Sequence, residues 1–177
     1  MLEISEEDYA MKFAMLIILD EKKTAGMDRY TENFKYILES YSAQLKNHPA
    51  LVLQEDEAGC DPEEEKKQVK LLAEVCKVGN IGLILRQSSL ERSKLFSLLV
   101  DAIGRAVTLV HFYAPDGEML AKILRESYCS WRDLSDIQLC RNLHISRSTL
   151  FRKRQQALMY AGYFFYEAVL PDMGGQI

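Results

Sequence analysis

The sequence contains few residues that interrupt a helix. It has only four Pro and nine Gly among 177 residues, which leaves long stretches in which a helix can continue unbroken. Hydrophobic residues make up 48% of the chain and charged residues 27%. These proportions provide enough apolar side chains for a core and too many charges for a membrane-embedded protein. A largely disordered chain is not expected either.

Sequence features that direct a protein to a membrane or out of the cell are also missing. A signal peptide begins with positive charge, whereas the N-terminus here is acidic, with Glu3, Glu6, Glu7 and Asp8. The apolar run Phe13–Leu19 is far shorter than the ~20 residues that span a bilayer. We therefore predict a cytoplasmic protein that does not contact a membrane.

Patterns that bind metals or carry out common enzymatic reactions are absent from the sequence as well. It has no Gly-rich phosphate loop and no nucleophile elbow. The cysteines form no Cys-x-x-Cys pair and have no His at zinc-ligand spacing: Cys60, Cys76, Cys129 and Cys140. The three histidines occur in unrelated settings: His48, His111 and His144. We predict reduced thiols, no cofactor and no enzymatic activity.

Apolar residues recur at helical spacing along the chain, which predicts an all-α fold. Helices are expected to begin near residues 5, 28, 62, 89, 116, 136 and 147. The clearest start is Asp61-Pro62 followed by Glu63–Glu65, where a capping acid precedes Pro and three acids face the positive end of the helix dipole. The helix from Ser89 to about Tyr113 is apolar on most sides, so we expect it to be the central buried helix.

These elements suggest a helical bundle in three parts. Residues 1–88 form an N-terminal helical region with an acidic loop at Gln54–Asp61. Residues 89–170 form a helical core that contains a helix-turn-helix at 135–166, and residues 171–177 form a flexible tail. The second helix of that motif is expected to be long, from Arg147 to about Val169.

The two parts of the chain differ in charge. Residues 1–118 carry 14 Lys and Arg against 21 Asp and Glu, whereas residues 119–177 carry eight against five. Between Ile137 and Tyr166 there are five basic residues and no acid. This asymmetry predicts a basic surface for a polyanion and an acidic part with another role.

The segment from Ser135 to Leu158 has the spacing of a helix-turn-helix. Ser135 can cap a short helix whose apolar residues are expected to face inward: Ile137, Leu139, Cys140 and Leu143. Cys140 supplies the small residue where two steeply crossing helices touch, and Ile145 and Leu150 supply apolar residues after the turn. His144 is expected at a position of positive φ, which His tolerates better than most residues other than Gly.

Ser146 can cap the second helix, whose first turns would enter the major groove of DNA. Arg can pair with guanine and Gln with adenine, while the helix N-terminus and further Lys or Arg side chains neutralise phosphates. Specificity is assigned to Arg147, Ser148, Phe151, Arg152 and Gln155. The full set of candidate DNA-binding residues is Ser146, Arg147, Ser148, Thr149, Phe151, Arg152, Lys153, Arg154 and Gln155.

The same segment resembles the sigma-factor region-four-like helix-turn-helix of ArpU-type phage transcriptional regulators. The matching residues are Ile123-Leu124, Tyr128, Leu134–Ile137, Leu143–Arg152 and Ala157-Leu158. The resemblance covers about a third of the chain, and His144 departs from the small turn residue of the family. It implies a sequence-specific regulator of phage or prophage genes that binds double-stranded DNA. RNA polymerase, contacted by the acidic half, and a second copy of the chain are further candidate partners.

Other interpretations remain open from the sequence. Basic helix faces are often merely solvated, and the chain could be a helical adaptor of the anti-sigma kind that binds protein and no DNA. In an adaptor, the basic residues could be paired with acids from residues 54–65. The aromatic stretch Tyr160–Tyr166 could pack against the helices of residues 89–128 or form a dimer contact.

Overall fold

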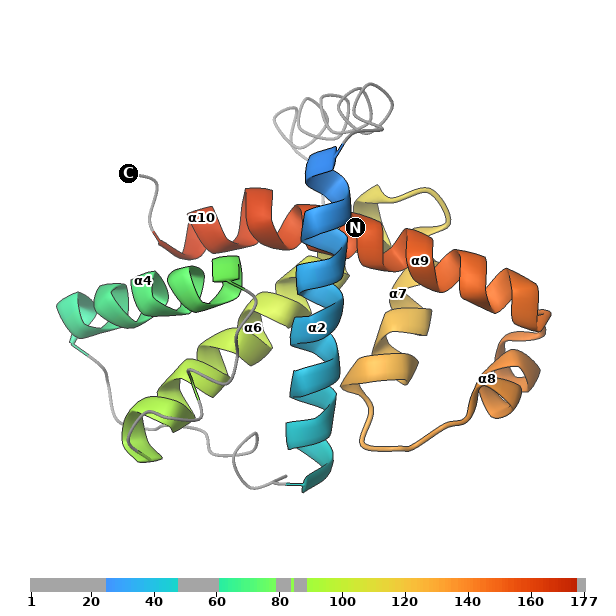
Figure 1. Cartoon of the computed structure of the whole chain (residues 1–177), viewed down its shortest axis with the longest axis horizontal. Coiled ribbons are helices and arrows are strands. Elements are labelled where there is room, and N and C mark those ends of the chain that lie inside the picture. The colour runs from blue at the N-terminus through green and yellow to red at the C-terminus, as the bar shows by residue number, and fades with distance from the viewer. Residues whose placement is uncertain (1–24, 48–60, 79–83, 85–88, 175–177) are drawn as a thin grey trace, which may run out of the picture.

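The computed structural model describes residues 25–47, 61–78, 84 and 89–174, and every regular element in these ranges is a helix (Figure 1). This result confirms the all-α prediction. The predicted helix near residues 5–19 and the acidic loop before Asp61 lie outside the described residues. In chain order the elements are α2 (Ala25–Asn47), α4 (Pro62–Val78), α6 (Ser89–Tyr113), α7 (Gly117–Leu124), η1 (Arg125–Cys129), α8 (Asp136–Leu143), α9 (Arg147–Phe164), η2 (Phe165–Val169) and α10 (Leu170–Met173).

The last three elements form one long helix that runs across the molecule (Figure 1). η2 is a π-helical turn within it, and Pro171 follows directly after that turn, in α10. The helix therefore continues past residue 171, where the sequence predicted a tail. Asp172 in α10 accepts a hydrogen bond of 3.3 Å from Arg105 of α6.

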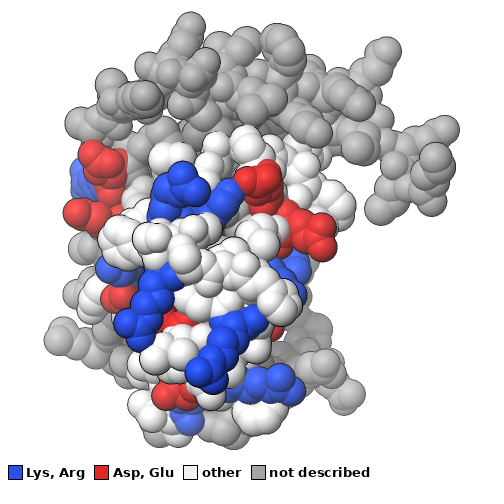
Figure 2. Space-filling model, turned by 90° about the vertical axis from the view of Figure 1, so that its right-hand side faces the viewer, with Lys and Arg blue, Asp and Glu red and all other residues white. Residues whose placement is uncertain are grey.

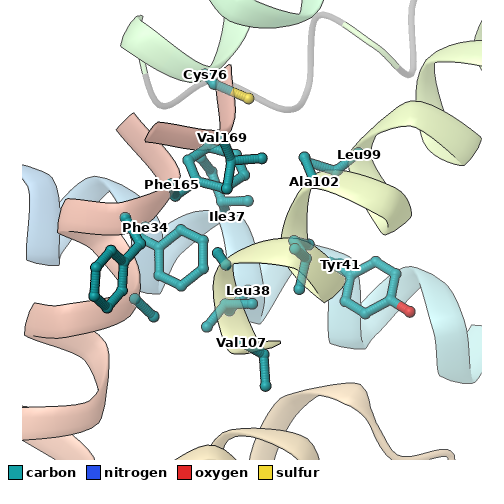
Figure 3. Close-up of a cluster of buried hydrophobic side chains, with 14 of the residues drawn as sticks. Phe34, Ile37, Leu38, Tyr41, Cys76, Leu99, Ala102, Val107, Phe165 and Val169 are labelled. Carbon is teal, nitrogen blue, oxygen red and sulfur yellow. The ribbon is translucent and has the colours of Figure 1, made fainter. Parts of the chain in front are cut away.

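One hydrophobic core joins helices from both sides of the boundary predicted at residue 88. α6 contributes most of its apolar residues to this core, as the sequence predicted for the central helix. Phe34 of α2 packs against Phe165 of η2, with the ring centroids 4.9 Å apart. Figure 3 shows where side chains of four elements meet: Phe34, Ile37, Leu38 and Tyr41 of α2, Cys76 of α4, Leu99, Ala102 and Val107 of α6, and Phe165 and Val169 of η2.

α2 crosses the long helix at very short range. A Cβ atom built on Gly162 would lie 2.9 Å from the carbonyl oxygen of Tyr30, so the crossing needs a residue without a side chain. Next to it, Tyr30 stacks on Tyr166 with ring centroids 4.8 Å apart and donates a 2.6 Å hydrogen bond to Glu167. The aromatic stretch is thus largely buried, as one interpretation of the sequence predicted. α6 and α7 also pack against the helix that contains this stretch, but the close crossing is made by α2.

The helix segment Arg92–Tyr113, with a mean hydropathy of 1.6, is long and apolar enough to cross a membrane. Core helices of globular proteins have the same composition. Here the segment contributes buried side chains that include Leu95, Phe96 and Leu99, and it packs against α4, α7 and α9. Of the apolar stretch within this segment, 44% is buried inside the protein.

Candidate nucleic-acid interface

Capping interactions define the segment α8–turn–α9. Ser135 and Gln138 form a capping box: the Ser135 hydroxyl accepts from the Gln138 N–H, and the Gln138 side chain accepts from the Ser135 N–H at 2.9 Å. α8 ends at His144, which has φ 55° and ψ 41°. Ser146 then caps α9 by accepting a 3.1 Å hydrogen bond from the Thr149 N–H. Both helix starts and the positive φ of His144 were predicted from the sequence.

A small second core holds α8 against α7 and α9. Its buried members are Ile123, Leu139, Leu143 and Leu150. Cys140 and Ile145 are partly buried at its edge, but Ile137 is 46% exposed, so the prediction that it faces inward is wrong. α8 has only two turns, and the hydrophobic pattern of so short a helix does not fix which apolar residue points outward. This core places the first turns of α9 at one end of the molecule (Figure 1).

Most of the predicted DNA-binding residues lie on the outer side of α9 or at its cap. Six are exposed: Ser146, Arg147, Ser148, Phe151, Arg152 and Gln155. Arg147, Phe151 and Gln155 follow one another at intervals of four residues and therefore share one helix face. Thr149 is partly buried, and its hydroxyl accepts a 2.9 Å hydrogen bond from Ser146. Ser146 and Thr149 thus stabilise the start of the helix.

Lys153 and Arg154 have partners within the protein. Lys153 is 18% exposed and pairs with Asp116, which precedes α7; Arg154 is 19% exposed and pairs with Asp136 of α8 at 2.7 Å. Hydrogen bonds from these cations hold the pKa values of both carboxyls below their ordinary range. The two pairs tie α7 and α8 to α9. The structure therefore places these side chains in internal contacts, whereas the sequence assigned them to the DNA backbone.

The sequence did not identify Asp116 and Asp136 as the acids that pair with Lys153 and Arg154. Asp116 follows a Pro and Asp136 begins a helix, and both positions have ordinary local explanations in turns and caps. Their partners lie 37 and 18 residues away, beyond the range of helical periodicity. The sequence had suggested acids of residues 54–65 as partners for the basic residues. The partners found within the described residues are instead Asp116 and Asp136.

The remaining cations of the segment form no ion pair with any acid that the structure describes. Across the described part of the chain, no ion pair involves Arg141, Arg147 or Arg152, and all three are exposed. Figure 2 shows the end of the molecule where α8 and the start of α9 lie, with Lys and Arg side chains spread among uncharged side chains and some Asp and Glu side chains. This arrangement leaves positive charge available to an anionic partner.

Beside these cations, an open hollow of about 550 Å³ separates α8 from the start of α9. Its lining is Ile137, Cys140, Arg141, His144, Ile145 and Arg147. The described residues contain no group of three or more His, Cys, Asp or Glu side chains that could hold a metal ion.

Replacing His144 by Gly is expected to raise the free energy of unfolding by about 0.5–1 kcal/mol. Left-handed backbone geometry costs a residue with a Cβ about 1–2 kcal/mol, and the greater freedom of Gly in the unfolded chain offsets part of the gain. Urea unfolding followed by circular dichroism measures the difference. His144→Val is the control and should destabilise the protein, since a branched side chain fits φ 55° poorly. A Gly variant less stable than the original protein would contradict the prediction.

Comparisons with models of protein families, with curated proteins and with solved structures gave no significant match.

Proposed function

We propose that α8 and α9 form a helix-turn-helix that binds double-stranded DNA, and that the protein is a sequence-specific transcriptional regulator. The observation that carries the proposal is the outer side of α9, where Arg147 and Arg152 are exposed next to Ser148 and Gln155 and form no ion pair with an acid among the described residues. An α-helix fits the major groove, and these side chains have the donors and acceptors that base edges require.

The packing around α9 suits that role. A recognition helix must keep its side chains in fixed positions relative to the duplex. Here the small core and the pairs Asp116–Lys153 and Asp136–Arg154 hold the start of α9, while its second half is anchored in the main core. Arg141 on α8 is available for a phosphate. The resemblance to ArpU-type regulators supports phage or prophage genes as the target.

A helical adaptor that binds a protein and no DNA is the second candidate. The observation that favours it is the exposed Ile137 at the hollow between α8 and α9, because apolar side chains at a hollow are typical of protein-binding surfaces. Arg141 and Arg147 line the same hollow, so such a partner would be acidic.

Fluorescence anisotropy of the full chain on labelled duplexes tests DNA binding. Random-sequence duplexes and duplexes from upstream regions of the host genome are titrated at about 50–200 mM salt. With about three phosphate contacts, affinity should fall about 40-fold over this range, since each neutralised phosphate releases counterions. Absence of binding at the lowest salt by a protein that is helical by circular dichroism would reject the proposal and favour the adaptor.

A further inference from the structure

Phe151 is exposed in a way that the fold does not explain. It is 66% exposed, whereas Phe164 and Phe165 farther along the same helix are buried. Its neighbour Leu150 is the residue of α9 that enters the small core, so Phe151 points away from that core. A large apolar side chain held on the outside of a rigid helix is a candidate contact for a partner.

The surroundings of Phe151 restrict what that partner is. Arg147 precedes it by one helical turn, Gln155 follows by one turn, and Arg152 is adjacent, all of them exposed. The partner must therefore present an apolar group within an anionic, hydrogen-bonding surface. The major groove of DNA does so at one place only, the C5-methyl group of thymine, which protrudes among base-edge donors and acceptors between two rows of phosphates.

A second copy of the chain fits the same surface poorly. In a symmetric dimer formed through the exposed face around Phe151, this same face of both copies meets, so Arg147 and Arg152 of one copy would lie close to Arg147 and Arg152 of the other. Like charges placed opposite each other in an interface are strongly unfavourable. The carboxylate that interacts electrostatically with Arg147, Asp136 of α8, is already paired with Arg154, and Glu167 of the same long helix lies four turns away.

We propose that Phe151 contacts a thymine methyl group in the major groove and so imposes an A·T pair at one position of the preferred site. This inference rests on the proposed DNA binding through α9 and adds a determinant of specificity to it. Arg147, Arg152 and Gln155 would contact neighbouring base pairs or phosphates. Removal of the thymine methyl should then weaken binding only while residue 151 carries an apolar side chain long enough to reach the methyl group.

The test begins with selection of duplexes from a random-sequence library by the full-length protein. Each thymine of the selected duplex is next replaced in turn by deoxyuridine, which removes the methyl group and keeps the pairing. At one thymine the affinity should fall about fourfold, the effect of losing the burial of one methyl group. In Phe151→Ala the same replacement should have no effect, and Phe151→Leu should retain part of the dependence.

Phe112→Ala is the matched control, since Phe112 on α6 is also a largely exposed Phe, at 60%, and lies outside the α8–α9 segment. In Phe112→Ala, deoxyuridine should lower the affinity for the duplex as much as it does in the original protein. If deoxyuridine is neutral at every thymine, or if its effect is the same in Phe151→Ala, the role of Phe151 is rejected while DNA binding stands. If no duplex is enriched in the selection, sequence-specific DNA binding is rejected and this inference with it.

Discussion

Replacing Gly117 by Ala is expected to destabilise the protein by about 3 kcal/mol or more. A Cβ atom at this position would lie 2.3 Å from the carbonyl oxygen of Val110 and 2.4 Å from that of His111. Both are backbone atoms in the last turns of α6, which cannot move aside as a flexible side chain can. Overpacking of a core typically costs 1–3 kcal/mol, and a clash with two backbone atoms belongs at the upper end of this range or beyond it.

The clash would also disturb the arrangement of α9. Gly117 begins α7, which lies between the two cores: Leu120 and Leu124 enter the main core, while Ile123 enters the small core beneath α9. If α7 moves away from α6, Asp116 moves with it and the pair with Lys153 is strained. We therefore expect the Ala variant to lose DNA binding in proportion to its loss of folded protein.

Urea unfolding measures the effect, and Gly104→Ala is the control. Gly104 lies in the middle of α6, and a Cβ atom there would have nothing within 4 Å. Because Gly in a helix is less stable than Ala by roughly 0.5–1 kcal/mol, that substitution should stabilise the protein. If both substitutions change the free energy of unfolding equally, the close approach of α7 to α6 does not restrict the size of the side chain at residue 117.

Local sequence signals were sufficient to place α8 and α9. Ser135 and Ser146 cap the two helices, and His144 has the left-handed conformation expected between them. Each of these features depends on hydrogen bonds between residues at most five positions apart, for example from the Thr149 N–H to Ser146 and from the Ile145 N–H to the Cys140 carbonyl. Such short-range preferences can be predicted without knowledge of the rest of the fold.

The partners of the helices could not be predicted in the same way. Periodicity shows which face of α9 is apolar, but it does not show that α2 crosses at Gly162. The sequence likewise shows that Lys153 and Arg154 are basic, but their pairing depends on where α7 and α8 are packed. In this packing, Lys153 and Arg154 form ion pairs within the protein, whereas another group of basic residues, which includes Arg147 and Arg152, is exposed.

Because Lys153 forms an ion pair within the protein, the expected result for Lys153→Ala differs from the result that the sequence alone predicts. From the sequence alone, Lys153 would contact phosphate, and its loss would weaken binding to all duplexes alike. Paired with Asp116 and largely covered, it instead supports the position of α7. The substitution should therefore lower the urea midpoint and weaken DNA binding less than Arg152→Ala does. A loss of affinity larger than that of Arg152→Ala, at unchanged stability, would contradict this assignment.

The double variant Arg147→Ala/Arg152→Ala is expected to weaken binding to the selected duplex by about 30-fold or more. A good pairing of one Arg with a base is worth about 1–3 kcal/mol, so the loss of two corresponds to about 2–6 kcal/mol. Both side chains are exposed, and no ion pair among the described residues depends on them. The urea midpoint should therefore change little. Anisotropy on the selected and on random duplexes, at one fixed salt concentration, measures the difference.

Lys67→Ala/Lys70→Ala is the matched control, because it removes the same charge from two exposed residues of α4. α4 lies at the opposite end of the molecule from α8 (Figure 1), so this pair should leave binding nearly unchanged. Equal losses in both double variants would mean that only total charge matters and that α9 does not read the duplex. Unchanged binding by the Arg variant would place the DNA on another surface. The expected result, a loss confined to the Arg variant and greater on the selected duplex than on random DNA, requires contact between bases and the start of α9.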